Sequence, residues 1–136
     1  MLTMKQVCSR VGMRYETLKF YCNEGLVPGV RRDKHNHRVF DERDVAWLQS
    51  LGCLKRCGMS LEEMKTYMTL CLEGESSIPR RREMLAAQRE QLLIRQAEVQ
   101  ASLAFIDRKQ QFYADVLEGK KPYVSNLIEP HKDGLH

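Results

Sequence analysis

The sequence predicts a mainly α-helical protein: a winged helix-turn-helix head with a short two-stranded wing, then one long helix. Two observations predict the head, because short helical segments meet at Gly12 and a basic, turn-rich stretch follows over residues 29–40. A third predicts the long helix, since apolar residues recur every seventh position from Ile78 to Tyr113. We therefore divide the chain into a head over 1–72, a helix over 78–117 and a short irregular tail over 118–136.

Composition and charge narrow the classes of function. With 29% charged and 43% hydrophobic residues, the chain is typical of a soluble protein. It holds no apolar run near the roughly 20 residues that cross a bilayer and no apolar signal-peptide core, so we expect a cytoplasmic protein without a membrane partner. Residues 1–56 hold eleven Lys/Arg and six Asp/Glu, a balance of +5, whereas residues 57–136 hold eleven and twelve, a balance of −1. A basic first part on a near-neutral body indicates a head that binds nucleic acid.

The first two helices form the predicted helix-turn-helix. Thr3 with Gln6 makes a capping box for a helix over 4–11, whose apolar positions share one face. Gly12 turns the chain into a second helix that Gly25 closes. On this second helix Leu18 and either Tyr21 or Cys22 face the first, so the polar side chains between them point outward, where they suit phosphates and base edges.

The stretch from Gly29 to Phe40 is basic and predicts two short strands, Val30–Arg32 and His37–Phe40, around a turn. Such a wing grips the DNA backbone beside the groove. His35 and His37 lack sulfur or carboxylate partners at a ligand spacing, so we expect no metal there.

Two further helices follow the wing. Asp41 caps a helix to about Cys57, and Cys53 and Cys57 fall opposite its apolar face. Ser60 and Glu63 make another capping box, for a helix to about Leu72. A loop over residues 73–77 leads to the long helix.

The long helix would extend about 60 Å at 1.5 Å per residue, with nothing else in the chain large enough to cover it. We therefore expect it to pair with a second copy, although a helix folded back on its own domain is the alternative. The predicted seam consists of Ile78, Leu85, Leu92, Val99, Leu103, Ile106 and Tyr113.

Several segments of the head, in order and spacing, resemble the amino-terminal domain of the MerR family of transcription regulators. These segments are Met4–Gly12, Thr17–Tyr21, Gly25–Pro28, Arg38–Phe40 and Asp44–Gly58. Two residues depart from the family pattern: Arg14 replaces the usual serine N-cap, and Glu16 stands where a basic residue is common. A carboxylate there can accept from cytosine N4 and so alter base preference.

The resemblance implies a homodimer, joined by an antiparallel coiled coil, that binds a pseudo-palindromic operator. It also implies distortion of a promoter so that RNA polymerase engages it. Phe20, Tyr21 and Lys55 occupy positions that contact the DNA backbone in the family. Together with the residues expected from the helix and the wing, the predicted DNA-binding set is Arg14, Tyr15, Glu16, Thr17, Lys19, Phe20, Tyr21, Arg31, Arg38 and Lys55.

The cysteines suggest which kind of signal the protein detects. Five cysteines, none in a Cys-x-x-Cys pair, are expected to stay reduced in the cytosol. Cys53, in Leu51–Lys55, resembles the lone cysteine of the NmlR/AdhR-like branch, which responds to aldehyde, thiol and nitrosative stress. We predict that Cys53 senses electrophiles or oxidants, with Cys57 as an auxiliary thiol, and that the protein needs no cofactor. An inert thiol at the subunit interface is the alternative.

Other classes remain as alternatives. The chain has no paired-carboxylate, Ser/His/Asp or phosphate-loop pattern of an enzyme. A small architectural DNA-bending protein would not need the heptad helix. A metal-responsive regulator could use Cys53, Cys57 or Cys71, and elemental analysis of anaerobically purified protein would separate it from the thiol hypothesis.

Overall fold

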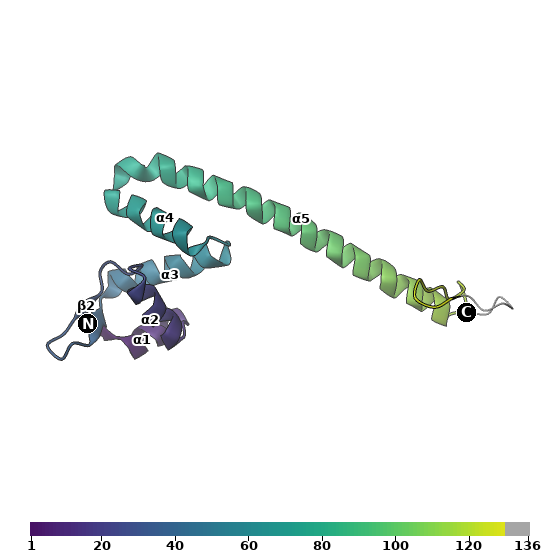
Figure 1. Ribbon diagram of the computed structural model, residues 1–136, viewed down its shortest axis with the longest axis horizontal. Coiled ribbons are helices and arrows are strands. Elements are labelled where there is room, and N and C mark those ends of the chain that lie inside the picture. The colour runs from purple at the N-terminus through teal and green to yellow at the C-terminus, as the bar shows by residue number, and fades with distance from the viewer. Residues whose placement is uncertain (130–136) are drawn as a thin grey trace. The chain divides into compact units, whose positions relative to one another are not determined.

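A computed structural model of the chain describes residues 1–129. The first compact unit ends at Leu92, and the second begins at Leu93. The observed elements are β1 (Leu2–Thr3), α1 (Met4–Val11), α2 (Tyr15–Asn23), β2 (Arg31–Arg32), β3 (Arg38–Phe40), α3 (Glu42–Arg56), α4 (Leu61–Glu73), the short 3-10 helix η1 (Glu75–Ser77) and α5 (Ile78–Leu117). The predicted mainly helical fold, with a short wing and a long carboxy-terminal helix, is confirmed (Figure 1).

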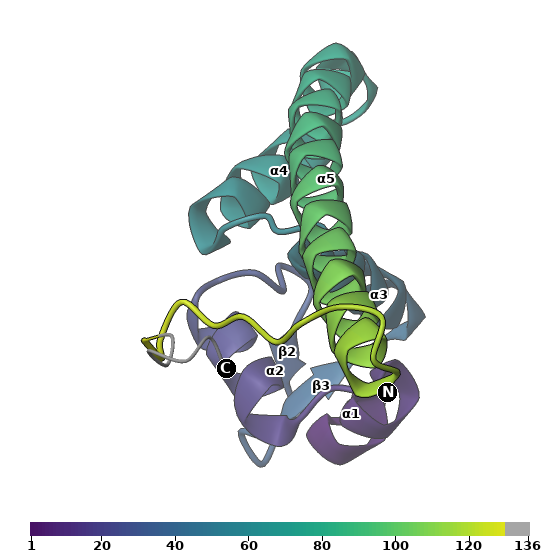
Figure 2. The same cartoon turned by 90° about the vertical axis from the view of Figure 1, so that its right-hand side faces the viewer.

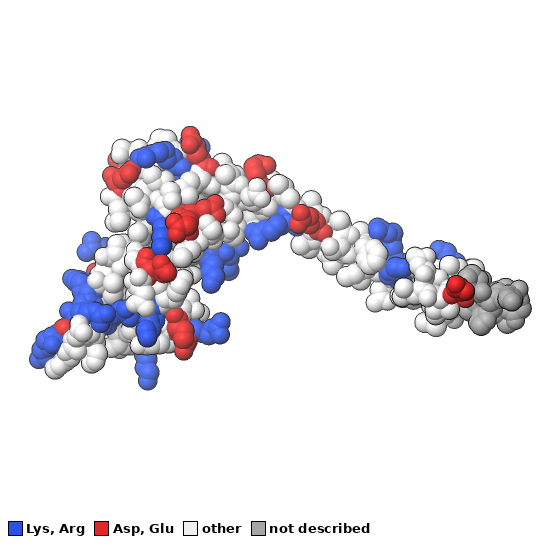
Figure 3. Space-filling model, viewed as in Figure 1, with Lys and Arg blue, Asp and Glu red and all other residues white. Residues whose placement is uncertain are grey.

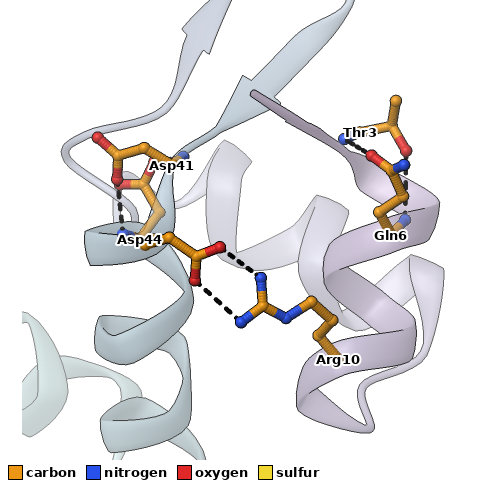
Figure 4. A network of polar contacts seen from close by, with 6 residues as sticks. Thr3, Gln6, Arg10, Asp41 and Asp44 are labelled. Carbon is orange, nitrogen blue, oxygen red and sulfur yellow. Dashed lines mark hydrogen bonds and ion pairs between the residues drawn. The ribbon is translucent and has the colours of Figure 1, made fainter.

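Local side-chain contacts explain where most helices of the head begin. Three of them start with reciprocal capping boxes, formed by Thr3 and Gln6, by Asp41 and Asp44, and by Ser60 and Glu63. Figure 4 shows the first of these pairs, in which each partner bonds the backbone N–H of the other. Helix α2 is different, because its N-cap residue Arg14 makes no side-chain capping bond. The missing cap that the sequence predicted is therefore confirmed.

The wing belongs to a sheet of three strands rather than two, in the order β1-β3-β2. Leu2 lies opposite Phe40 and Arg31 opposite Val39, and both pairings are antiparallel. The prediction missed β1 and made the two wing strands one residue too long, because strands this short carry no alternating pattern. Phe40 is fully buried, so β3 fixes the wing beside α1 and α2 (Figure 2).

The core of the head lies between α1, α2, α3 and the sheet. Its fully buried large side chains are Val7, Leu18, Leu26, Phe40, Leu48 and Leu51. A surface ion pair also joins α1 to α3, since both Nη atoms of Arg10 donate to the Glu42 carboxylate at 2.6 and 2.9 Å. Both side chains are exposed, so the pair adds little stability.

The predicted loop between α4 and α5 contains η1, which tightens the turn. Ser77 at its end is fully buried, and its Oγ lies 2.8 Å from the carbonyl oxygen of Gly74. Arg81 donates to the same carbonyl at 2.8 Å. Two turns further along α5, Gln88 is 8% exposed and donates to the carbonyl oxygen of Cys57 at 2.8 Å. These bonds fasten the start of α5 to the head.

Beyond Leu92 the helix has no core of its own among the described residues. Large apolar side chains stay exposed in the second unit, such as Val99 (57%) and Ile106 (52%). After α5 the chain turns at Gly119, and Lys121 pairs with Asp115 at 3.3 Å. Residues 118–129 form neither helix nor strand, and the rest of the predicted tail lies outside the described residues. No helix in the described part of the chain is long and apolar enough to span a membrane.

Candidate nucleic-acid interface

Helix α2 carries an exposed polar face above a buried apolar one. Leu18 is fully buried, whereas Tyr15 is 49% exposed and Glu16 and Lys19 are also exposed. Thr17 is half-buried. The helix is nine residues long and depends on the core beneath it for stability. It therefore presents Tyr15, Glu16 and Lys19 outward, as the sequence predicted.

The two aromatic residues of α2 differ in exposure. Phe20 is 46% exposed and its ring lies 6.2 Å from that of Tyr21. Tyr21 is only 3% exposed and belongs to the hydrophobic core, because it lies on the same face as Leu18. It also lines a groove between α2 and α3. Tyr21 lies mainly in the core, and its contact with DNA stays a prediction.

Both predicted wing arginines already have partners within the protein. Arg38 donates to Asn23 Oδ1 at 2.6 Å, which ties β3 to the end of α2. Arg31 donates to Asp41 Oδ2 at 3.3 Å. Asp33 shapes the wing turn by accepting from the backbone N–H groups of residues 35 and 37, and these bonds hold its pKa below the usual range. The Arg38 bond therefore links the wing to α2.

A hollow of about 410 Å³ lies between the wing, the start of α1 and Tyr15. Lys5, Arg32, His37 and Arg38 line it, and Figure 3 shows Lys and Arg side chains gathered on the head. Lys5 and Arg32 were not among the predicted DNA-binding residues. Their place beside Tyr15 depends on the pairing of β1 with β3, which the sequence did not reveal.

The cysteines fall into different environments. Burial is the main cause that raises the pKa of the Cys8 and Cys22 thiols, which disfavours the reactive thiolate in both. Cys57 and Cys71 are half-buried, and Arg81 approaches the Cys71 sulfur at 3.8 Å. Cys53 is the exposed cysteine, and Arg56 Nη2 donates to its Sγ at 3.2 Å. The described residues contain no cluster of three potential metal ligands.

Comparison with known families decides the identity. The sequence matches the family described as "MerR HTH family regulatory protein" over residues 2–71 and the one described as "MerR, DNA binding" over residues 45–109. The chain belongs to the MerR family. It is thus a DNA-binding transcription regulator of the MerR type, as the head geometry and the basic wing indicate, and its relatives are regulators rather than enzymes.

Individual MerR relatives cover most of the chain. An uncharacterised HTH-type transcriptional regulator of Haemophilus influenzae is 33% identical over 111 residues, 82% of each chain. AdhR of Bacillus subtilis is 33% identical over 92 residues, which are 68% of this chain and 66% of AdhR. The crystal structure of HiNmlR, a MerR family regulator lacking the sensor domain and bound to promoter DNA, superposes with a TM-score of 0.75 at 32% identity. That superposition covers 86% of this chain and 89% of HiNmlR.

Proposed function

We propose that two copies of this MerR regulator bind a pseudo-palindromic promoter operator and distort it, so that RNA polymerase uses the promoter in response to electrophile or redox stress at Cys53. The observation that carries the proposal is the combination of an outward-facing polar α2 with an exposed Cys53 that receives a guanidinium N–H bond. The similarity to promoter-bound HiNmlR and to AdhR supports the same reading.

Dimerisation is inferred from the exposed apolar column of α5. Leu85 is 42%, Val99 57% and Ile106 52% exposed, although their heptad spacing is that of a coiled-coil seam. A helix of 40 residues with such a column is stable in water only when the column is covered. We infer that a second copy of the chain packs antiparallel against this column. The two heads then lie at a fixed separation and bind two half-sites.

DNA contact would combine base contacts from α2 with phosphate contacts from its edges. Lys19 pairs with a backbone phosphate, and Arg31 and Arg38 hold the wing against the backbone. Tyr15, Glu16 and Thr17 face the groove, where Glu16 accepts from a cytosine amino group. Bending and untwisting the promoter costs several kcal/mol, so small changes in head geometry suffice to control transcription.

Sensing would begin at the Cys53 sulfur. An aldehyde adds to it as a hemithioacetal: an S–C bond forms, the carbonyl π bond breaks, and the former carbonyl oxygen takes the thiol proton. The Arg56 guanidinium, which donates to Sγ, lies beside the attacking sulfur. Cys53 is exposed to such a reagent, whereas Cys8 and Cys22 are partly buried.

Lys19 tests the DNA-binding part of the proposal. An operator is first selected from random duplexes, and binding of Lys19→Ala is measured across salt concentrations. We expect weaker binding and a salt slope lower by about one per lost phosphate contact. Lys109→Ala, on the distal part of α5, is the control and should leave both unchanged. An unaltered slope for Lys19→Ala would refute the phosphate role.

Cys53→Ser tests the sensor. In transcription assays with RNA polymerase and the selected promoter, formaldehyde or methylglyoxal should change the output of the parent protein and not that of the variant. Operator affinity should be the same for both proteins. Cys22→Ser, at a thiol of raised pKa, is the matched control and should respond normally. A Cys53→Ser protein that still responds would rule out this sensor.

A further inference from the structure

A groove of about 560 Å³ separates the start of α2 from the last turns of α3. Three cationic residues line it, Arg14 at the N-cap of α2 and Lys55 and Arg56 at the end of α3. Thr17 and Gln49 add polar groups, and none of the described lining residues is acidic. A concave surface with three cations and no carboxylate favours an anion.

Cys53 lies in the wall of this same groove. Its sulfur accepts a bond from Arg56 Nη2 at 3.2 Å, so the thiol holds the guanidinium beside the groove. Residues 53 and 56 are one helical turn apart, which makes this contact a local property of α3. The chemical state of one sulfur and the position of one of the three cations are therefore linked.

We infer that this groove binds a backbone phosphate of the DNA and that an anionic modification of Cys53 acts on that contact directly, through its charge. The inference rests on the proposed function, since it takes DNA as the partner of the head and Cys53 as the modified residue. It assigns Arg56 as a further phosphate contact beside Arg14 and Lys55. Guanidinium groups pair with phosphate through parallel N–H bonds, which suits Arg56 to this role.

The physical consequence depends on the group added to the sulfur. An adduct with a negative charge lies next to the phosphate site, repels the phosphate and takes Arg56 as its own partner. A neutral adduct, the aldehyde hemithioacetal included, removes only the hydrogen bond to sulfur and leaves the three positive charges available. Regulation would then act within a single head, at the DNA surface, without a change in the spacing of the two heads.

Two alkylating reagents of similar size separate charge from bulk. The thiolate displaces iodide from iodoacetate or from iodoacetamide: an S–C bond forms, the C–I bond breaks, and the thiol proton goes to the buffer. The first product carries a carboxylate, and the second carries a neutral amide. The full chain is treated with each, modification of Cys53 is verified by mass spectrometry, and Cys53→Ser treated in parallel reports the effect of the other four cysteines.

Binding to a fluorescein-labelled duplex of mixed sequence is measured from about 50 to about 200 mM salt, because phosphate contacts do not depend on sequence. We expect the carboxymethylated protein to bind roughly three- to tenfold more weakly, with a salt slope lower by about one per subunit. The carbamidomethylated protein should bind within about twofold of the untreated protein. Equal effects of both adducts, or no effect of either, would overturn the inference.

Arg56→Gln provides a second measurement that does not require alkylation. We expect it to lower the salt slope by about one per subunit, as the loss of one phosphate contact should. Arg108→Gln, at an exposed position of α5 on the face opposite Leu103 and Ile106, is its control. An unchanged slope for Arg56→Gln would remove Arg56 from the site.

Failure of the inference and failure of the proposed function give different results. If the untreated protein does not bind duplex DNA at low salt, the proposed function fails and the inference falls with it. If the untreated protein binds but both adducts behave alike, the inference alone fails. A Cys53→Ser protein that still responds to aldehydes removes the sensor role from the proposed function, whereas the effect of adduct charge is decided by the two alkylated proteins.

Discussion

The head and the distal part of α5 differ in how far their apolar side chains are buried. In the head, residues from four helices and a three-stranded sheet close around a core in which Leu18, Leu26 and Leu51 are fully buried. From Leu93 onward, the large apolar side chains of α5 are exposed to solvent, as Val99 and Ile106 show. The head can therefore be stable as a single chain, whereas the exposed apolar residues of α5 form the surface that the proposed dimer would cover.

The largest expected effect comes from placing a charge among the exposed apolar residues of α5. Ile106→Asp places an unpaired carboxylate in the proposed seam, at a cost of about 3–5 kcal/mol per subunit. Sedimentation should show a monomer at concentrations where the parent chain is a dimer. Operator affinity should fall roughly a hundredfold, because the two heads are no longer linked.

Ala101→Asp is the control for that variant, since residue 101 is exposed and lies on the face of the helix opposite Val99, Leu103 and Ile106. It introduces the same charge into the same helix and should leave the dimer intact. If Ile106→Asp sedimented like the parent chain, α5 would not be the dimerisation element and the contrast between the two regions would disappear.

The second effect belongs to the head alone. Leu18→Ala leaves a cavity at a fully buried position and should lower the free energy of unfolding of the head by about 2–5 kcal/mol. Trp47 is the single tryptophan and is half-buried in the head, so its fluorescence during urea unfolding reports this region. Leu72→Ala, at a residue that is 65% exposed, is the comparison and should cost less than about 1 kcal/mol. Equal losses for the two variants would show that the core is elsewhere.

The smallest effect is a dependence on pH, and it too should be confined to the head. Hydrogen bonds from backbone N–H groups hold the pKa of Asp41 and Glu63 below their usual range. Carboxylates with a lowered pKa stabilise the fold above their ordinary values of 3.8 and 4.5, and that contribution is lost as the pH falls through the folded-state pKa.

The measurement is thermal unfolding of the head, followed by Trp47 fluorescence between neutral pH and pH about 3. We expect a loss of stability on acidification that Asp41→Asn reduces, because asparagine still caps a helix but does not titrate. If Asp41→Asn and the parent chain lost stability in parallel, the capping carboxylate would not contribute to the acid sensitivity.

Prediction from sequence succeeded where structure depends on near neighbours. The helix α1 begins and ends where Thr3, Gln6 and Gly12 indicated, and α5 begins and ends at the predicted Ile78 and Leu117. It was less complete where distant segments meet. The strand β1 pairs with residues nearly forty positions away, and this pairing brings Lys5 and Arg32 beside Tyr15.

The predicted functional residues divide in the same way. The outward direction of Glu16 and Lys19 follows from the helical period, and the structure places both on the surface. The partners of Arg31 and Arg38 come from α2 and the start of α3, and nothing in the wing sequence indicated them. Tyr21 was assigned to the interface by family position, whereas its burial follows from packing against the core.

The sequence by itself thus determined the helices, their caps, the family and the exposed face of α2, because capping boxes and helical periods act within a few residues. The tertiary structure decided which of those residues share a surface. It placed Cys53 in one groove with Arg14 and Lys55, which lie about forty residues apart in the chain, because packing of α2 against α3 brings their ends together.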